Sequence, residues 1–362
     1  NALQRLTSRG GSATQIEPEL IFLVRQLEHL SACDWSHWSL CVDTFKRFCQ
    51  HPGQGERLSL AFRSVALPLS SADQLALSTA ISQQFHAPLL PAPAVTPMPA
   101  RLRVGYLGTR FGHHATGLLL RDVLSAHDTA SVDVFLLDLG RDDSGAISQQ
   151  LRTTPGLQTV ALHDFDDTKA AERIAALQLD ILIDLNGYND DPRPGILARR
   201  PAPVQIGWLA APYSSGAPWM DYIISDAQVR PDDDWCSEAE ALLPQSYFVF
   251  SREALPPITT ARQALGLPDN RFVFACLNSA FRIDPDTFGV WMNILRQAPE
   301  SVLWLLADSP AMVLNLKREA EWQGVDPRRL LFATRTSTSA HLARLAAADL
   351  YLDTRYCNGH TS

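Results

Sequence analysis

The sequence predicts an α/β fold in which a helical segment precedes two Rossmann-like domains, each a parallel sheet covered by helices on both faces. Beyond residue 100, short apolar runs alternate with amphipathic helical stretches, and continuous apolar runs are typical of strands buried on both faces. Before residue 90, apolar residues recur only at helical spacing. We therefore expect a TPR-like helical segment with its linker at residues 1–100, a first α/β domain at 101–258 and a second at 259–362.

The first segment is expected to be helical, without a strand. Helices are predicted at Pro18–Leu30, Trp35–Gln50 and Ala72–Phe85, the last opened by a serine cap. Paired short helices are typical of an α-repeat array, but the stretch is too short to reveal a repeat period. His86–Pro99 contains five prolines and predicts a stiff or wrapped linker at a domain boundary.

The two α/β domains show the same alternation of elements. In the first domain, strands are expected at Leu102–Leu107, Val132–Leu137, Thr159–Leu162, Ile181–Leu185, Val204–Leu209 and Tyr222–Ile224, and helices at Thr116–Ala126, Ser144–Leu151 and Lys169–Leu177. In the second, strands are expected at Phe272–Leu277, Val302–Leu306, Leu330–Ala333 and Leu350–Asp353, and helices at Thr260–Leu265, Pro285–Gln297, Met312–Trp322 and Ser339–Ala347. The default ligand site is the cleft between two such sheets, at the carboxyl ends of their strands. An open sheet edge after Ser362 would leave backbone groups unpaired, so we expect the second domain to be incomplete here and the natural chain to continue.

Composition excludes several classes of protein. The formal net charge of −8 over 362 residues argues against a nucleic acid or an anionic membrane surface as the main partner. No apolar run approaches the roughly 20 residues that span a bilayer. The six cysteines lack C-x-x-C spacing and several lie in apolar runs, which indicates buried thiols of a cytoplasmic protein rather than a disulfide framework or a zinc site.

The motifs favour a phosphate ligand over a dinucleotide. Gly105, Gly108 and Gly112 follow a G-x-x-G-x-x-x-G spacing that does not match the dinucleotide fingerprint, and Walker A and H-E-x-x-H motifs are absent from the sequence. Aspartate-rich stretches at 164–167 and 232–234 are interpreted as solvated loops rather than metal sites. The last residues, Arg355–Ser362, follow a strand and are expected to open a helix, where backbone N–H groups would hold a phosphate. Two Rossmann-like units with such a loop are typical of a nucleotide-sugar glycosyltransferase of the GT-B kind.

Seven ordered segments carry a resemblance to a known family. They are Leu102–Tyr106, Phe111–Gly117, Asp184–Tyr188, Arg200–Gln205, Ser215–Tyr222, Pro299–Leu306 and Cys357–Thr361. The chain resembles the O-GlcNAc transferase (SPINDLY-like) family of protein glycosyltransferases, as a bacterial-type homologue, from about Cys33 to its end. The resemblance implies inverting, metal-independent transfer of N-acetylglucosamine, or a relative such as fucose or a hexose, from a UDP-sugar to Ser or Thr of a protein, without a cofactor.

The resemblance also assigns site residues. Catalytic roles fall on His114, at the mouth of the active site, and on Arg282, which replaces a lysine that reaches the diphosphate. The UDP-sugar would be bound by Arg282, His341 at the uracil, Arg344, Gly359, His360, Thr361 and Ser362. The acceptor side is expected at His113, Thr116 and Tyr213. No metal ligand is implied.

Several positions depart from the family pattern. Arg110 replaces an aspartate, His113 an asparagine, Ala115 a proline, and Tyr213 a small residue expected to line the cleft. Three interpretations stay open at this point: a specialised bacterial transferase, a catalytically weakened homologue that binds nucleotide or protein, and a protein that acts mainly by binding partners through its N-terminal helices.

Overall fold

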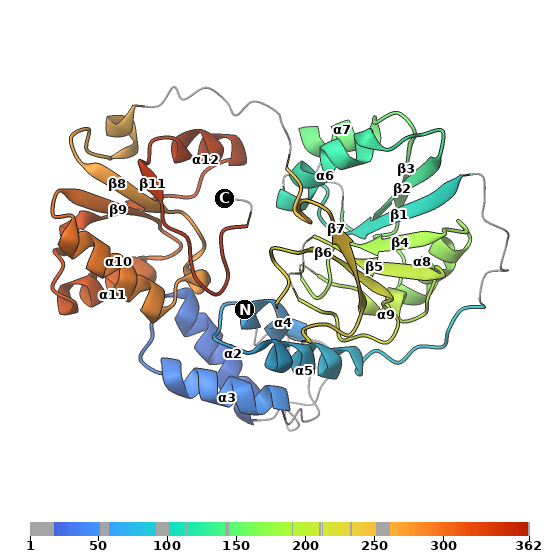
Figure 1. Cartoon of the computed structure of the whole chain (residues 1–362), viewed down its shortest axis with the longest axis horizontal. Helices are drawn as coiled ribbons and strands as arrows, with labels where there is room; N and C mark the ends of the chain where they lie inside the picture. Colours follow the sequence, from blue (N-terminus) through green and yellow to red (C-terminus); the bar gives the residue numbers. More distant parts are fainter. Residues whose placement is uncertain are drawn as a thin grey trace.

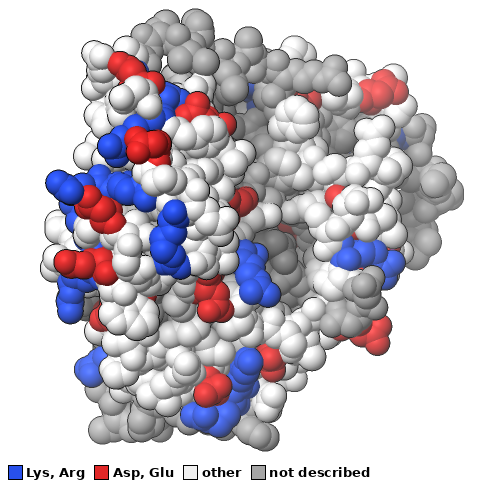
Figure 2. Space-filling model, turned by 60° about the vertical axis from the view of Figure 1, so that its left-hand side comes forward, with Lys and Arg blue, Asp and Glu red and all other residues white. Residues whose placement is uncertain are grey.

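The computed structural model describes residues 18–50, 58–91, 101–112, 114–141, 145–189, 191–209, 211, 213–231, 234–250 and 261–360. The chain forms two α/β domains, with a helical part below and between them (Figure 1). On the face shown in Figure 2, acidic and basic side chains are interspersed and no broad basic patch is visible. Within the described residues, no helix is long and apolar enough to cross a membrane.

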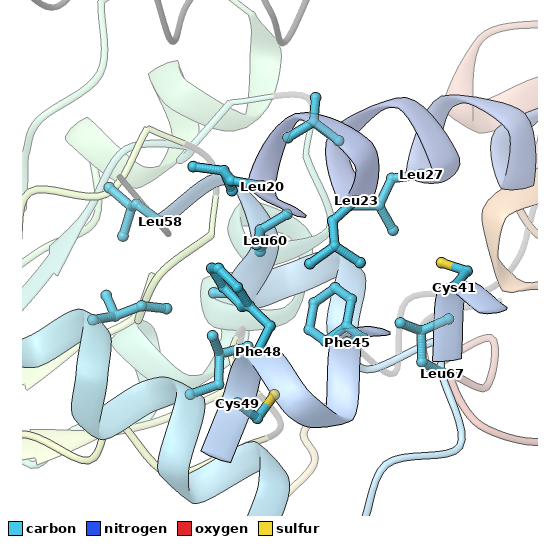
Figure 3. Close-up of a cluster of buried hydrophobic side chains, with 14 of the residues drawn as sticks. Leu20, Leu23, Leu27, Cys41, Phe45, Phe48, Cys49, Leu58, Leu60 and Leu67 are labelled. Carbon is cyan, nitrogen blue, oxygen red and sulfur yellow. The ribbon is translucent and has the colours of Figure 1, made fainter. Parts of the chain in front are cut away.

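The helical part consists of α2 (Pro18–Ser31), α3 (Trp38–Gln50), α4 (Leu58–Ser64) and α5 (Ser71–Ser82). Ser70 caps α5 in a reciprocal capping box with Asp73, which satisfies two backbone N–H groups at the helix start. Leucines of α2 and α4 meet the phenylalanines of α3 in one apolar core (Figure 3). The three predicted helices are confirmed. The short α4 was not predicted, because seven residues are too few for a helical period to stand out.

The first domain is built on a parallel sheet. Among the described residues it has seven strands in the order β3-β2-β1-β4-β5-β6-β7. These are β1 (Leu102–Gly108), β2 (Val132–Asp138), β3 (Leu157–Ala161), β4 (Ile181–Asp184), β5 (Val204–Gly207), β6 (Tyr222–Asp226) and β7 (Ala239–Leu243). The helices are α6 (Ala115–Ala126), α7 (Ala146–Arg152), α8 (Asp167–Ala175) and α9 (Pro194–Leu197). Side chains of β2 alternate between two cores, with Val134 and Leu136 in one and Phe135 and Leu137 in the other, so both faces are covered as predicted.

The second domain repeats this plan with a smaller parallel sheet. Its described strands follow the order β10-β9-β8-β11. They are β8 (Phe272–Cys276), β9 (Ser301–Leu306), β10 (Leu330–Ala333) and β11 (Leu350–Tyr351), and the helices are α10 (Pro285–Gln297), α11 (Pro310–Trp322) and α12 (Thr338–Leu345). Short 3₁₀ turns lie at η1 (Arg262–Leu265), η2 (Ala280–Arg282) and η3 (Pro327–Arg329).

The structure corrects three sequence-based expectations. The helix predicted from Thr260 is only the short 3₁₀ turn η1, which ends at the left-handed Gly266. Strand β11 is two residues long rather than four. Strand β7 was missed because alanine, glutamate and leucine favour a helix in isolation, and pairing with β6 overrides that preference. The predicted domain boundaries, near residues 100 and 258, lie outside the described residues.

Strand order determines where a ligand site can form. In the first sheet β1 lies between β2 and β4, and in the second β8 lies between β9 and β11. Strand order reverses at these two points, and the loops that leave neighbouring strands there diverge and open a crevice. The segments after β1, β4, β8 and β11 are therefore the natural lining of a site.

The helical part contacts both α/β domains. Asn315 of α11 donates its side-chain N–H to the carbonyl of Ala32 at 3.0 Å. The ring of Trp35 lies 5.6 Å from that of Phe288 in α10. On the other side, the Ser82 hydroxyl donates to the carbonyl of Gly216 in the first domain at 2.8 Å. The helical part thus joins the two domains.

Replacing Gly216 with alanine should destabilise this junction. Gly216 has φ of +59°, and a Cβ built there would overlap the backbone of Thr79 in α5. The left-handed backbone alone costs an L-residue roughly 1–2 kcal/mol, and the overlap adds to that cost. Gly266→Ala is the matched control, since Gly266 has φ of +72° with nothing within 4 Å. We expect a larger drop in thermal unfolding midpoint for Gly216→Ala, and equal drops would contradict the role of the overlap.

Candidate active site

A cleft of about 560 Å³ lies between the two sheets. Helix α4, the first domain and the second domain all contribute to its lining. The lining residues on which the site depends are Phe62, His114, Thr116, Asn189, Trp208, Tyr247, Phe281, Arg282, Asn358 and His360. Most follow the strands that flank the two reversal points, as the topology requires.

His114 is the N-cap residue of α6, in the loop after β1. The backbone N–H of Thr116 donates to His114 Nδ1 at 3.3 Å. Because Nδ1 accepts this bond, the neutral imidazole carries its proton on Nε2 and acts there as a donor. Gly117 permits the tight approach of the loop to the helix, since a Cβ there would overlap the carbonyl of Phe111. His114 therefore combines a structural cap with a polar contact to the cleft.

Arg282 lies at the end of η2, in the segment that follows β8. Its Nη1 donates to the carbonyl of Asn358, which comes from the segment after β11. Its Nε is buried and finds no hydrogen-bond partner among the described residues. A buried guanidinium N–H without a partner is costly, so this group is suited to an anionic ligand in the cleft.

In the loop after β11, two backbone N–H groups form hydrogen bonds within the loop, although the sequence predicted that they would bind a phosphate. The N–H of Gly359 donates to Asp353 Oδ1 at 2.7 Å, and that of His360 donates to Asn358 Oδ1 at 3.1 Å. These two N–H groups, predicted to serve a phosphate, are engaged within the loop. Thr361 and Ser362 lie outside the described residues, so the helix predicted there is not tested. Cys357 and Asn358 line the cleft beside Arg282.

His360 reaches the first domain through its side chain. Its Nε2 lies 2.8 Å from the hydroxyl of Tyr247, and the two rings are stacked with centroids 6.1 Å apart. Tyr247 is itself fixed, because its carbonyl accepts from Trp208 Nε1 at 3.0 Å and its N–H donates to Asp226 at 2.7 Å. Burial, with the nearby charge of Arg282, lowers the pKa of His360. A neutral imidazole therefore joins the second domain to the first across the cleft.

His341 and Arg344 lie together on α12, apart from the residues that line the cleft. Arg344 is buried, donates to the carbonyl of Thr334, and donates from Nη2 to His341 Nδ1 at 2.8 Å. Burial, with the charges of Arg344 and Arg335, lowers the pKa of His341. Arg344 thus orients a neutral imidazole. The Nε of Arg344, like that of Arg282, is buried without a hydrogen-bond partner among the described residues.

The acceptor-side predictions have different outcomes. Thr116 lines the cleft. Tyr213 does not: it is 6% exposed, belongs to the core of the helical part, and donates to Asn189 Oδ1 at 2.9 Å. Its predicted place in the lining is wrong, because its ring packs into the apolar core of the helical part. His113 lies outside the described residues. Arg110 lines a neighbouring cavity of about 610 Å³ that shares His114 with the cleft.

The turn after β4 is held by a buried carboxylate. Asp184 accepts the N–H groups of Asn186 and Gly187 at 3.1 and 3.0 Å, and burial raises its pKa to about 6. The Asn186 amide donates to Thr109 Oγ1 at 2.8 Å, which ties this turn to the loop after β1. The two loops that bear Asn189 and His114 are therefore positioned together.

Four aromatic residues that sequence reasoning missed take part in the site. Phe62 of α4, Phe281, Trp208 and Tyr247 all line the cleft. Trp208 lies near the carboxyl end of the predicted strand Val204–Leu209, and that position could have pointed to it. Phe62 and Tyr247 belong to segments without a recognisable motif, so only the three-dimensional arrangement reveals them.

Two facing Rossmann-like sheets with a ligand cleft between them are the architecture of a GT-B glycosyltransferase. The model of glycosyltransferase family 41 matches residues 72–257 and 251–362. The chain belongs to this family.

Individual relatives agree with the family assignment. The chain is 32% identical over 326 residues to a protein of Arabidopsis thaliana named probable UDP-N-acetylglucosamine–peptide N-acetylglucosaminyltransferase SEC. It is 25% identical over 458 aligned residues to the UDP-N-acetylglucosamine–peptide N-acetylglucosaminyltransferase of Caenorhabditis elegans. Among solved structures, a mutant of the Thermobaculum terrenum O-GlcNAc transferase matches with a TM-score of 0.78 and 25% identity.

These matches cover most of this chain but only part of its relatives. They include 83% of the chain and 33% of the Arabidopsis protein, and 91% of the chain and 40% of the C. elegans protein. The solved structure is matched over 91% of this chain and 64% of its own. The similarity therefore spans the helical part and both α/β domains, within longer relatives.

Removing the Tyr247 hydroxyl should weaken the link across the cleft. Tyr247→Phe keeps the ring stacking and loses one neutral hydrogen bond, which contributes about 0.5–1.5 kcal/mol. We expect a modest fall in unfolding free energy that is not additive with His360→Ala, because both changes remove the same bond. Tyr222→Phe is the control, since Tyr222 is 41% exposed. Additive losses in the double variant would contradict the link.

Proposed function

We propose that this protein transfers N-acetylglucosamine, or a related sugar, from a UDP-sugar to a Ser or Thr hydroxyl of a protein, with inversion and without a metal or other cofactor. The observation that carries the proposal is the Nε of Arg282 in the cleft between the two sheets, which is buried and has no hydrogen-bond partner among the described residues. The names of the two relatives, which give UDP-N-acetylglucosamine and peptide as the substrates, support the donor and the acceptor class.

The donor would bind on the second domain. The neutral imidazole of His341, held by Arg344, offers a flat face to the uracil. The diphosphate would lie beside Arg282 and the segment of Asn358 and His360, which line the cleft together. The sugar would then extend toward His114 and Thr116 of the first domain, where the acceptor hydroxyl enters. Arg344 acts in this proposal by orienting His341.

The chemistry requires stabilisation of a leaving diphosphate. As the acceptor oxygen forms its bond to the anomeric carbon, the bond from that carbon to the phosphate oxygen breaks, and the electron pair leaves with UDP. A fixed positive charge near that oxygen lowers the barrier because it interacts more strongly with the transition state than with the substrate. Arg282 carries a permanent charge and can bind a phosphate through two N–H groups at once, at the position where the family has a lysine.

His114 would act as a hydrogen-bond donor. Its Nδ1 accepts from the Thr116 N–H, so a lone pair on Nε2 is available only in the other tautomer. We therefore propose that His114 contacts the sugar or the acceptor oxygen. Another group, or water, would remove the proton of the acceptor hydroxyl.

We further propose that the protein works in the cytoplasm. Its six cysteines, at positions 33, 41, 49, 236, 276 and 357, are all free thiols, which is consistent with a reducing compartment. The interspersed charges on the surface of Figure 2 fit a protein acceptor better than a polyanion.

Calorimetric titration with UDP and UMP tests the donor site. A hydrogen bond to a charged group contributes about 1.5–3 kcal/mol, so Arg282→Ala should weaken UDP binding roughly 10- to 100-fold. UMP, which lacks the second phosphate, should be affected little. Arg296→Ala is the control, because Arg296 is an exposed arginine at the far end of α10. A wild-type chain that binds UDP no better than UMP would contradict the proposed function.

A second variant separates the two roles of His114. Asparagine is among the best N-cap residues, so His114→Asn should keep the start of α6 and its thermal stability while losing the Nε2 donor. We expect sugar transfer from UDP-N-acetylglucosamine to fall by about tenfold or more, as for other polar groups that act in the transition state, with UDP affinity unchanged. His114→Ala should lose stability as well. Full activity in the asparagine variant would assign His114 to capping alone.

A further inference from the structure

Helix α4 of the helical part reaches the loop that carries Arg282. The ring of Phe62 lies 5.7 Å from the ring of Phe281, centroid to centroid. The guanidinium carbon of Arg63 lies 4.4 Å from the centroid of the same ring. Phe62 and Phe281 both line the cleft. Two consecutive residues of a seven-residue helix thus hold one side chain of the second domain.

Arg63 is fixed from its own side. Its Nη1 donates to the Ser31 hydroxyl at 3.1 Å, and that hydroxyl donates to the Leu27 carbonyl at 2.9 Å, so α2 holds the guanidinium in place. Burial lowers the pKa of Arg63 and the nearby carboxylate of Asp308 opposes this effect, but an arginine stays charged at neutral pH. A buried cation over an aromatic face is attracted by the negative face of the ring.

Phe281 also contacts the group that the proposed reaction needs. The guanidinium carbon of Arg282 lies 5.5 Å from the centroid of the Phe281 ring. The same loop is anchored behind by Asp308, which accepts the Ala280 N–H at 2.6 Å. Two contacts therefore orient Arg282. One is its bond to the Asn358 carbonyl, and the other is the Phe281 ring, which Phe62 and Arg63 of α4 contact.

We propose that Phe62 and Arg63 are positioning residues for Arg282: by holding Phe281, they direct the guanidinium toward the diphosphate of the donor. This inference rests on the proposed function. It makes the helical part a component of the donor site, in addition to any role in binding acceptor proteins. The alternative is that these contacts only attach the helical part to the second domain.

The test compares UDP with UMP, because the proposal places Arg282 beside the diphosphate and UMP lacks the second phosphate. In calorimetric titrations of the full chain, Arg63→Ala should weaken UDP binding about five- to tenfold, below the loss for Arg282→Ala, since the charge itself remains. UMP affinity should stay the same. In a double-mutant cycle, Arg63→Ala should add little once Arg282→Ala is present. Arg47→Ala, which removes an exposed arginine of α3 that bonds only to Thr44 in the described contacts, should leave both affinities unchanged.

The outcomes are distinguishable. Equal weakening of UDP and UMP, or full additivity in the cycle, would mean a purely structural contact and would overturn the inference. An unchanged UDP preference in Arg63→Ala would overturn it too, while leaving the proposed function in place. A wild-type chain without any preference for UDP would overturn both. If Arg63→Ala does not fold, Ser31→Ala keeps the guanidinium and removes its bond to the Ser31 hydroxyl, together with the bond from that hydroxyl to the Leu27 carbonyl. It should lower UDP affinity in the same selective way, and no selective loss there would overturn the inference.

Discussion

The site depends on one constraint: the two parallel sheets must face each other at the points where their strand order reverses. Neither sheet can impose this alone, because each is stabilised by its own pair of cores. The helical part supplies the constraint through packing on both sides, with Trp35 against Phe288 and Ser82 bonded to Gly216. The bond between Tyr247 and His360, which both line the cleft, adds a second link between the two domains. A cleft formed from three parts of the chain is thereby given a defined shape.

Within this frame, the charges are arranged around a half-buried cation. Arg282 is partly satisfied by the Asn358 carbonyl and keeps an unpartnered Nε among the described residues. Two histidines of the second domain, His341 and His360, have lowered pKa values and are neutral near pH 7. Positive charge is thus concentrated at the proposed diphosphate position, while our proposal places the neutral ring of His341 against the base. In the proposed reaction, such an arrangement would stabilise the charge that develops on the leaving diphosphate.

The sequence predicted the fold better than the site, for physical reasons. Continuous apolar runs such as residues 134–137 within β2 are decisive for buried parallel strands, and these strands were located within a few residues. Arg282, Thr116 and His114 follow such strands or begin the next helix, so topology brings them to one cleft. Tyr213 was misplaced because a sequence position near a cleft does not say which way a ring packs. The engagement of the Gly359 N–H by Asp353 was equally hidden, because it depends on how the loop folds back on its own strand.

The arginine at position 282 also explains why α4 matters. A lysine ammonium is a compact point charge on a flexible stem, and it can follow a phosphate without being oriented. A guanidinium is planar and donates along fixed directions, so its contribution depends on the plane in which it is held. Here the Phe281 ring and the Asn358 carbonyl both contact the guanidinium of Arg282 and fix the plane in which it lies. Because Phe62 and Arg63 contact Phe281, our proposal links the arginine at position 282 to the contact with the helical part: an arginine there would need the orientation that α4 provides.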